Sequence, residues 1–421
     1  MTRIENTSAA HLPDRGVRPH GNDLPANLIF ELFYITLQYR YLKMNREFFK
    51  AAIMTNHPGK YLVMLALLSF CALPLQAGFF LPERIAGHCR DLAFSFQSQE
   101  LPQPEQSRIS VHDPVMIKAG ERYFLFCTGM GISVWSSTDM KAWQREKPVF
   151  SKPPVWATEA VEGFRGHIWA PDITFHDGLY YLYYSVSAFG KNTSCIGVAT
   201  NKTLDPADPE FGWTDHGKVI QSFPGITNWN AIDPNLVFDK KGNPWLSYGS
   251  FWDGLQLVRL DPSLTKPAEG CRPETFASRK PDPCMENPPS TDDNPQDAGG
   301  NAIEAPFIIR RGKYYYLFAS IDYCCKGVNS TYKMIIGRSK KVTGPYLDRE
   351  GKSLRTGGGT ILMQGDQDWH GVGHNGILNA GNTSYLLFHG YDAADRGRSK
   401  LRIFSLEWDK KGWPWPGTAV Y

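Results

Sequence analysis

The sequence predicts an all-β protein, and more narrowly a five-bladed β-propeller. Aromatic residues make up 13% of the 421 residues and occur with 39 Gly and 30 Pro, a composition typical of short strands and many turns. No sustained 3.6-residue periodicity follows residue 100, so little helix is expected. One opening motif recurs five times, which a two-sheet sandwich would not require.

Each repeat opens with a short motif, continues through a turn and then enters an aromatic strand. In the second repeat, Trp169-Ala170-Pro171-Asp172-Ile173 leads to a turn at 176–178 and the run LYYLYYSVS. Later runs such as SCIGVATN or KMIIGRSK bring each unit to about four strands. Successive copies start roughly 60 to 70 residues apart. They open at His112, Trp169, Ile232, Glu304 and His374.

The first hundred residues differ from the rest. An apolar run at 61–77 follows Lys60 and ends in the small residue Ala77, the pattern of a secretory signal peptide. A membrane anchor is the alternative, but the run is short and contains Pro74. A start at Met54 would give a normal signal and a secreted or periplasmic protein. The expected segments are 1–53 as an upstream extension, 54–77 as the signal peptide, 78–106 as a lead-in and 107–421 as the propeller.

The charge balance gives no sign of a nucleic-acid binder. The chain carries 45 basic and 42 acidic residues, a net charge of +3. This balance does not suggest a polybasic nucleic-acid binder. We expect no nucleic-acid partner, no stable membrane insertion and a monomer.

The cysteines fit an oxidising compartment without a zinc site. Seven of the eight follow the apolar run, and none has zinc-finger spacing. Cys271 and Cys284 bracket a Pro-rich loop, where a disulfide is plausible. Cys127 and Cys195 are expected to be buried small hydrophobes. A disulfide between the neighbours Cys324-Cys325 would be strained.

The opening motifs are expected to meet at one place. The first strand of each propeller blade lines the central channel, so equivalent positions converge although they are distant in sequence. Proline is tolerated near a strand start because its missing N–H need not serve the sheet. The side chains expected in this axial pocket are His112, Asp113, Trp169, Asp233, Glu304 and His374.

Three of these residues are acids, and together they suggest chemistry. A single Asp or Glu at a strand edge is more often a turn cap, but three in one pocket with Trp and His favour catalysis. Two carboxyls flanking a sugar are the machinery of glycoside hydrolysis, and a third tunes the proton donor. Asp172 follows its proline and is predicted to be structural. Asp113 and Asp233 directly precede their prolines, whereas Glu304 lies two residues before Pro306, so a local twist or the longer side chain must bring Glu304 into the pocket.

An ordered set of motifs then resembles a known family. The segments SVHDPVMI, HIWAPDI, NAIDPNLVFD, GSFWDGLQL, NAIEAPFI, YCCKGVNSTYK and GVGHNGIL fall within residues 110–417. They are similar to glycoside hydrolase family 43, and within it to the α-1,5-L-arabinanases. The resemblance implies a five-bladed propeller that hydrolyses arabinan, a plant pectic polysaccharide, with inversion.

The resemblance also implies roles for individual residues. Asp113 matches the general base, Glu304 the general acid, and Asp233 the acid that orients the donor and raises its pKa. His374 matches a histidine that holds a cation, often calcium, together with waters. The Cys324-Cys325 pair matches a feature of the pocket wall. Substrate-contacting positions match His112, Trp169, Phe189, Gly190, Asn230, Ala231, Ile232, Ser250, Phe251 and Trp252.

Two alternatives remain open at this point. One is an exo-acting α-L-arabinofuranosidase or β-xylosidase on the same fold, because the openness of the groove cannot be read from the sequence. The insertion at 266–300 could wall the groove or lie at its rim. The other is a sugar-binding propeller without activity, which would keep the aromatic side chains but would not need three acids.

Overall fold

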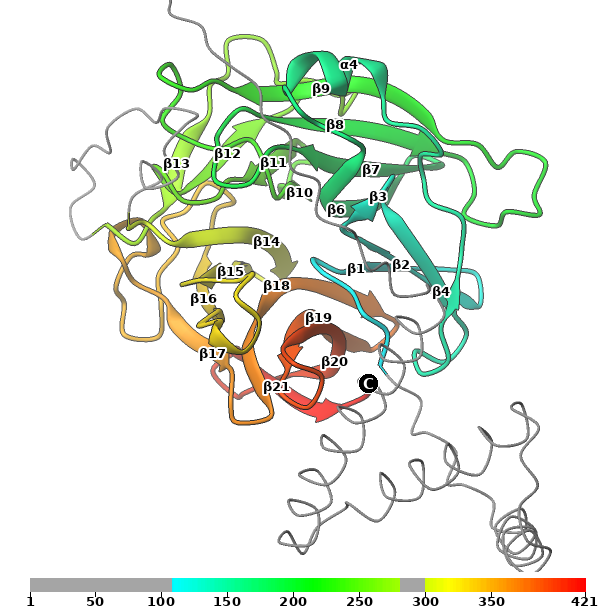
Figure 1. Cartoon of the computed structure of the whole chain (residues 1–421). Helices are drawn as coiled ribbons and strands as arrows, with labels where there is room; N and C mark the ends of the chain where they lie inside the picture. The colour runs from blue at the N-terminus through cyan, green and yellow to red at the C-terminus, as the bar shows by residue number, and fades with distance from the viewer. Residues whose placement is uncertain (1–107, 281–299) are drawn as a thin grey trace, which may run out of the picture. The chain divides into compact units, whose positions relative to one another are not determined.

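Five antiparallel sheets make up the part of the chain that the computed structural model describes, residues 108–280 and 300–421 (Figure 1). The sheets lie around a common centre, with β1, β6, β10, β14 and β18 innermost (Figure 1). This confirms the predicted all-β five-bladed propeller. The predicted upstream extension, signal peptide and lead-in lie outside the described residues.

Each blade is a meander of consecutive antiparallel strands, and β3 joins the second blade at its inner edge. The strands of the first two blades are β1 (Val115–Ala119), β2 (Arg122–Cys127), β4 (Ser133–Ser137), β5 (Gln144–Arg145), then β3 (Gly129–Met130), β6 (His167–His176), β7 (Leu179–Val186), β8 (Ser194–Asn201) and β9 (Thr214–Ser222). Those of the third blade are β10 (Asn235–Phe238), β11 (Pro244–Tyr248), β12 (Leu255–Arg259) and β13 (Glu274–Ala277). Those of the last two blades are β14 (Ile303–Arg311), β15 (Tyr314–Ile321), β16 (Lys333–Ser339), β17 (Thr360–Gln364), then β18 (Trp369–Ala380), β19 (Thr383–Asp392), β20 (Arg398–Trp408) and β21 (Pro414–Ala419).

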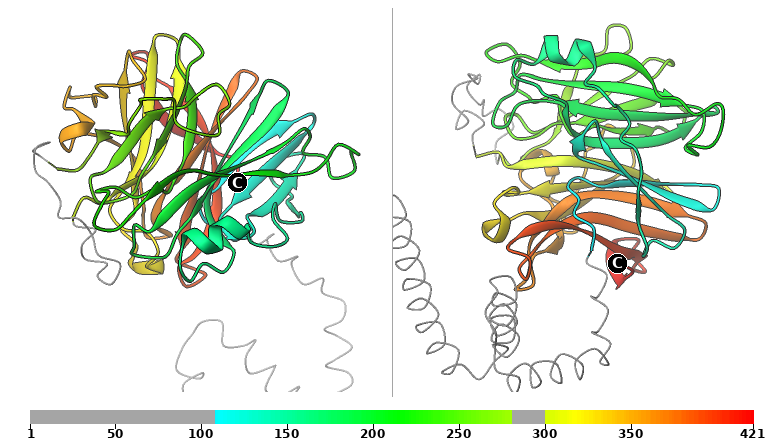
Figure 2. Two further views of the ribbon diagram at one scale, coloured as in Figure 1. Left: turned by 90° about the horizontal axis from the view of Figure 1, so that it is seen from above. Right: turned by 45° about the vertical axis from the view of Figure 1, so that its right-hand side comes forward.

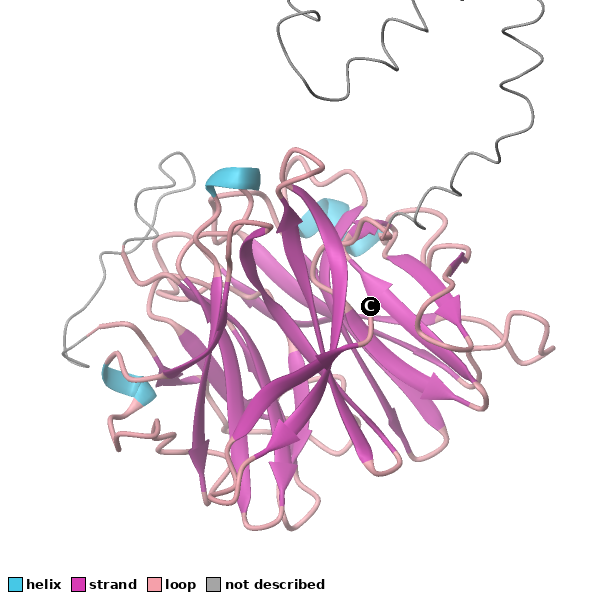
Figure 3. Cartoon of the chain, turned by 90° about the horizontal axis from the view of Figure 1, so that it is seen from below, coloured by secondary structure: helices cyan, strands magenta, loops and turns pink. Residues whose placement is uncertain are grey.

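Helix is minor, as the sequence predicted (Figure 3). The described residues contain one short α-helix, α4 (Val155–Ala160), and two 3₁₀ turns, η2 (Gly327–Asn329) and η3 (Leu354–Thr356). Within residues 108–280 and 300–421, no helix has the length and apolar character needed to cross a membrane.

Apolar side chains between adjacent blades hold the propeller together. Both faces of a middle strand are covered by neighbouring sheets, so β8 is buried along its whole length rather than at alternate residues. Figure 2 shows how the sheets are stacked around the centre. Cys127 and Cys195 lie in these cores, as predicted, and burial raises the pKa of each thiol to about 12.

The ring closes between the first and last blades. Leu125 of β2 packs with Leu387 and Leu401 of β19 and β20 in one buried cluster. The backbone N–H of Leu401 donates to the carbonyl of Ile109 at 3.0 Å, and the Ile109 N–H donates to the Tyr421 hydroxyl at 2.9 Å. Both ends of the propeller are therefore fastened to the same blade.

Candidate active site

The opening motif of every repeat contains one residue in the left-handed backbone region. Its φ angle is between 44° and 59° in all five blades, although none of the five residues is glycine. Such residues are uncommon and cluster at functional sites. They are Asp113, Ala170, Asp233, Ala305 and His374.

This left-handed residue explains how Glu304 reaches the pocket. The pairing of β14 with β15 shifts register between Glu304 and Phe307, so the backbone bulges at Ala305. Side chains that would alternate across a regular strand can then lie on the same side. In the first blade the neighbours His112 and Asp113 do so, with Nδ1 2.8 Å from Oδ1. The local twist is therefore the correct one of the two sequence explanations.

A ring of hydrogen bonds joins adjacent blades at these positions. The backbone N–H of each left-handed residue donates to a side chain of the preceding blade, over 2.8 to 3.1 Å. Because each bond crosses a blade boundary, the ring fixes the opening motifs relative to one another. In four cases the acceptor lies near the end of the second strand of its blade, and these acceptors are Thr128, Ser185, Ser320 and His389.

The third blade departs from this pattern and thereby pairs two acids. The equivalent position is Gly249, whose N–H donates to the Ile232 carbonyl but which has no side chain to accept a bond. The carboxylate of Asp233 takes over this role and accepts the Ala305 N–H at 3.1 Å. Since Ala305 directly follows Glu304, the bond places Asp233 beside Glu304.

Four polar side chains surround Asp113, and His112, His374 and Thr128 can donate to its carboxylate, whereas Nδ1 of His389 accepts the Asp113 N–H. Its Oδ1 lies 2.8 Å from Nδ1 of His112, 3.1 Å from that of His374 and 3.6 Å from that of His389. Its Oδ2 accepts a hydrogen bond from the Thr128 hydroxyl at 2.5 Å. Burial by itself raises the pKa of Asp113, but the three imidazoles outweigh burial and hold that pKa well below its usual range. Asp113 is therefore ionised at neutral pH.

The pKa values of Glu304 and Asp233 are raised, in contrast to that of Asp113. Burial raises the pKa of Glu304, which the Tyr332 phenol and the Ser250 hydroxyl partly offset, and the charge of Asp113 raises it further. The Ser250 hydroxyl donates to Oε2 of Glu304 at 2.7 Å. Burial, followed by the charge of Glu304, raises the pKa of Asp233 well above its usual range. The pocket thus combines an ionised carboxylate with a pair that favours holding a proton.

Two of the predicted aromatic contacts are open to solvent. Trp169 is half-buried, and its indole N–H donates to Nδ1 of His167 at 2.8 Å. Phe189 follows β7 on a loop and is 78% exposed, next to Gly190 with a φ of 74°. Both rings leave surface on which the C–H face of a sugar can pack.

The remaining predicted contacts are mostly buried. Ser250 bonds Glu304, and Phe251 packs near Tyr323 with ring centroids 5.9 Å apart. Trp252 is 3% exposed, and its carbonyl accepts the side-chain amide of Asn301. The segment before Asp233 is buried as well, and it comprises Asn230, Ala231 and Ile232.

Comparison with known proteins identifies the family. A family model described as glycosyl hydrolases family 43 matches residues 107–414. The chain belongs to this family. The match covers nearly all of the propeller, including the three acids and the ring of hydrogen bonds.

Relatives of this family 43 chain include enzymes of two specificities. It is 49% identical over 307 residues to the extracellular exo-α-(1→5)-L-arabinofuranosidase ArbA of Cellvibrio japonicus, covering 73% of this chain and 86% of that protein. It is 45% identical over 308 residues to the extracellular endo-α-(1→5)-L-arabinanase 1 of Bacillus subtilis, covering 72% and 87%. The solved structure of Cellvibrio cellulosa α-L-arabinanase complexed with arabinohexaose has a TM-score of 0.70 and 47% identity, covering 74% of this chain and 96% of that one.

His374 is the residue that the resemblance assigned to a cation. One ring nitrogen faces Asp113, and the ring is largely buried. The groups of three or more metal-ligating side chains found among the described residues do not include His374.

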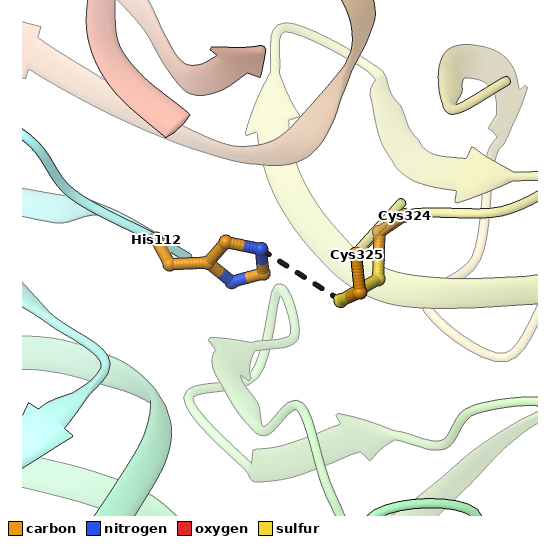
Figure 4. A group of neighbouring side chains, drawn as sticks. All are labelled: His112, Cys324 and Cys325. Atoms are coloured by element: carbon orange, nitrogen blue, oxygen red, sulfur yellow. Dashed lines mark hydrogen bonds between the residues drawn. A yellow bond between two sulfur atoms is a disulfide. The ribbon is translucent and has the colours of Figure 1, made fainter. Parts of the chain in front are cut away.

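The adjacent cysteines form a disulfide beside His112 (Figure 4). Sγ of Cys325 lies 3.8 Å from Nε2 of His112. The structure therefore places Cys324-Cys325 at the pocket, where the resemblance expected them. Cys271 is not disulfide-bonded to any described residue, and its predicted partner Cys284 lies outside the described residues.

Sequence reasoning missed the side chains that support the acids. Thr128 and His389 contact Asp113, and Tyr332 lies against Glu304. A signal was present, because the polar residue follows the aromatic second strand at the same place in four repeats, in the runs FLFCT, YYS, LFAS and LFH. Aligning the repeats by their second strands, as well as by their opening motifs, would have found it.

Proposed function

We propose that this family 43 protein hydrolyses internal α-1,5-L-arabinofuranosidic bonds of arabinan with inversion. The printed activity of the Bacillus subtilis relative and the arabinohexaose in the Cellvibrio complex support this substrate. One observation carries the proposal. The pocket brings together Asp113, whose pKa is held well below its usual range, and Glu304, whose pKa is raised.

Asp113 is the general base in this proposal. An inverting hydrolase needs an ionised carboxylate that removes a proton from the attacking water. The imidazoles around Oδ1 and the hydroxyl on Oδ2 favour the charged form and fix its orientation. Asp113 therefore stays ionised down to low pH.

Glu304 is the general acid. Its raised pKa keeps a proton on the carboxyl, which it donates to the departing sugar oxygen. Asp233 transfers no proton. Burial and mutual repulsion favour one proton on the Asp233–Glu304 pair, and in this proposal that proton lies on Glu304. The charge left on Asp233 then disfavours ionisation of Glu304, and the bond to the Ala305 N–H keeps Asp233 in place.

A hard cation such as calcium belongs to the proposal as a tuning element. His374 would be its one protein ligand, with water completing the shell, an unusual shell for calcium. When bound, the cation would add positive potential near the buried carboxyls. His374 itself orients Asp113 by the 3.1 Å contact with Oδ1.

Secretion is the proposed location of the activity. The relatives from Cellvibrio japonicus and Bacillus subtilis are both named extracellular. We place the signal at 54–77, with cleavage after Ala77 and Gly78 as the new N-terminus. Mass-spectrometric sequencing of the secreted protein tests this, and a mature chain that retains residues 1–53 would rule out the start at Met54.

The product profile on debranched linear arabinan tests the proposed mode of action. Mixed oligosaccharides early in the reaction support internal cleavage. The exo-acting alternative is favoured by the name of the Cellvibrio japonicus relative, and it predicts one short product from the first time point. No cleavage by wild type, with sugar binding retained, would identify a non-catalytic propeller.

A further inference from the structure

Tyr391 lies behind the pocket and contacts two of its parts. It is near the end of β19 and is 4% exposed. Its hydroxyl accepts the backbone N–H of Cys325 at 2.7 Å and lies 2.9 Å from Nε2 of His112. The phenol therefore connects the disulfide-bearing loop of the fourth blade to the opening motif of the first blade.

These two contacts define where the phenolic proton goes. The oxygen already accepts from Cys325 and has the Ser330 hydroxyl as a further donor, so its single proton can be donated to Nε2 of a neutral His112. Nε2 then carries no proton, so the ring proton lies on Nδ1. Nδ1 is the atom 2.8 Å from Asp113, whose carboxylate requires a donor.

Stacking also fixes the plane in which the His112 ring lies. It stacks on His389 with centroids 3.9 Å apart and an interplanar angle of 24°. Stacking restricts tilting but allows the ring to slide and rotate in its plane. The hydrogen-bond contacts at the two nitrogens, from Tyr391 and from Asp113, oppose that rotation, and the Cys325 sulfur lies further from Nε2, at 3.8 Å.

We propose that Tyr391 is a positioning residue for the reaction: it holds His112 so that the Nδ1–H points at Asp113. The Cys325 N–H directs the phenolic proton towards His112 and thereby completes the chain from the disulfide loop to the base. This inference rests on the proposed role of Asp113. Tyr391 touches neither the substrate nor the water and acts only through His112.

Nitrogen-15 NMR of the His112 ring tests the proton assignment without any substrate. Burial lowers the pKa of His112 but the neighbouring Asp113 carboxylate outweighs burial and raises it, so the spectra are recorded at an alkaline pH at which the ring has become neutral. Wild type should then show a protonated Nδ1 and an unprotonated, hydrogen-bonded Nε2. In free histidine the opposite tautomer predominates. In Tyr391→Phe the Nε2 signal should move towards its unbonded position and the Nδ1 proton should broaden. A protonated Nε2 in wild type, or unchanged His112 signals in the variant, would overturn the proposal.

Kinetics on linear arabinan test whether the contact matters for turnover. One hydrogen bond of ordinary strength corresponds to roughly a tenfold change, so Tyr391→Phe should lower kcat about tenfold with little change in KM. Tyr316→Phe is the matched control, since its buried hydroxyl donates to the Gly412 carbonyl on the outer part of the propeller. It should lose stability but keep kcat.

A double-mutant cycle separates positioning from a general structural role. In a His112→Ala background, Tyr391→Phe should leave the residual kcat unchanged, because its effect passes through His112. The same tenfold loss in both backgrounds would contradict the proposal. If wild type fails to cleave arabinan, the proposed function falls, while the NMR result still decides the role of Tyr391.

Discussion

Replacing Asp172 by Asn should make the protein more stable at alkaline pH. Asp172 is 3% exposed and lies between the second and third blades. Its Oδ2 accepts the Leu236 N–H at 2.8 Å, and its Oδ1 accepts the side-chain amide of Asn235 at 3.3 Å. Burial, only partly offset by these bonds, raises the pKa of Asp172 to about 7. An amide side chain imitates the protonated carboxyl and cannot ionise.

The size of the effect follows from linkage. The folded protein binds this proton more tightly than the unfolded chain, so protonation stabilises the fold below about pH 4, and the stabilisation is lost as the pH rises through about 7. The pKa of Asp172 differs by about 3 between the folded and the unfolded state, and each pKa unit corresponds to about 1.4 kcal/mol, so the effect is at most about 4 kcal/mol. The Asp172→Asn variant would lose the bond from Asn235, which costs about 1 kcal/mol. This variant should be up to about 3 kcal/mol more stable at pH 8 and within about 1 kcal/mol of wild type at pH 5.

Urea unfolding at both pH values measures this difference in free energy. Other buried carboxyls also affect the pH dependence, but they are shared by wild type and variant and cancel in the comparison. Asp205→Asn, at an exposed turn, serves as the control and should differ from wild type equally at both pH values. If Asp172→Asn also shows a constant difference, the burial argument is wrong.

Three further predictions concern the pocket. Asp233→Asn should lower the pKa of Glu304 by removing a neighbouring negative charge, so the alkaline limb of the pH–rate profile moves to lower pH. Thr128→Val removes the donor to Asp113, so the pKa of Asp113 should rise and the acidic limb should move to higher pH, with a stability loss of about 1 kcal/mol from the unpaired Ala170 N–H. Exhaustive chelation should lower kcat reversibly with little change in Tm, and unchanged kcat and Tm would exclude the cation proposed near His374.

The repeats made much of the architecture predictable. Turn residues, aromatic strands and a recurring opening motif gave the number of blades and placed Asp113, Asp233 and Glu304 around one centre. Asp172, predicted to be structural because it follows its proline, accepts hydrogen bonds from Leu236 and Asn235 of the third blade. These features depend on local pattern and period, which a sequence displays directly.

The contacts between blades could not be predicted in the same way. Gly249 has no side chain that could accept the Ala305 N–H, so Asp233 accepts this hydrogen bond instead. The bulge at Ala305 depends on a backbone angle that alanine rarely adopts. Tyr391 contacts His112 across 279 positions of the chain. Such pairs are set by how the sheets close into a ring.

The assignment of acid and base is tested most directly by comparing two substrates in two variants. The substrates are linear arabinan and an aryl α-L-arabino-oligoside with an activated leaving group. Glu304→Gln should lose about 10²–10⁴-fold in kcat/KM on arabinan but keep most activity on the activated substrate, which departs without protonation. Asp113→Asn should lose both, because every substrate needs an activated water. Equal losses for Glu304→Gln on the two substrates, with the activated substrate spared by Asp113→Asn, would contradict the account.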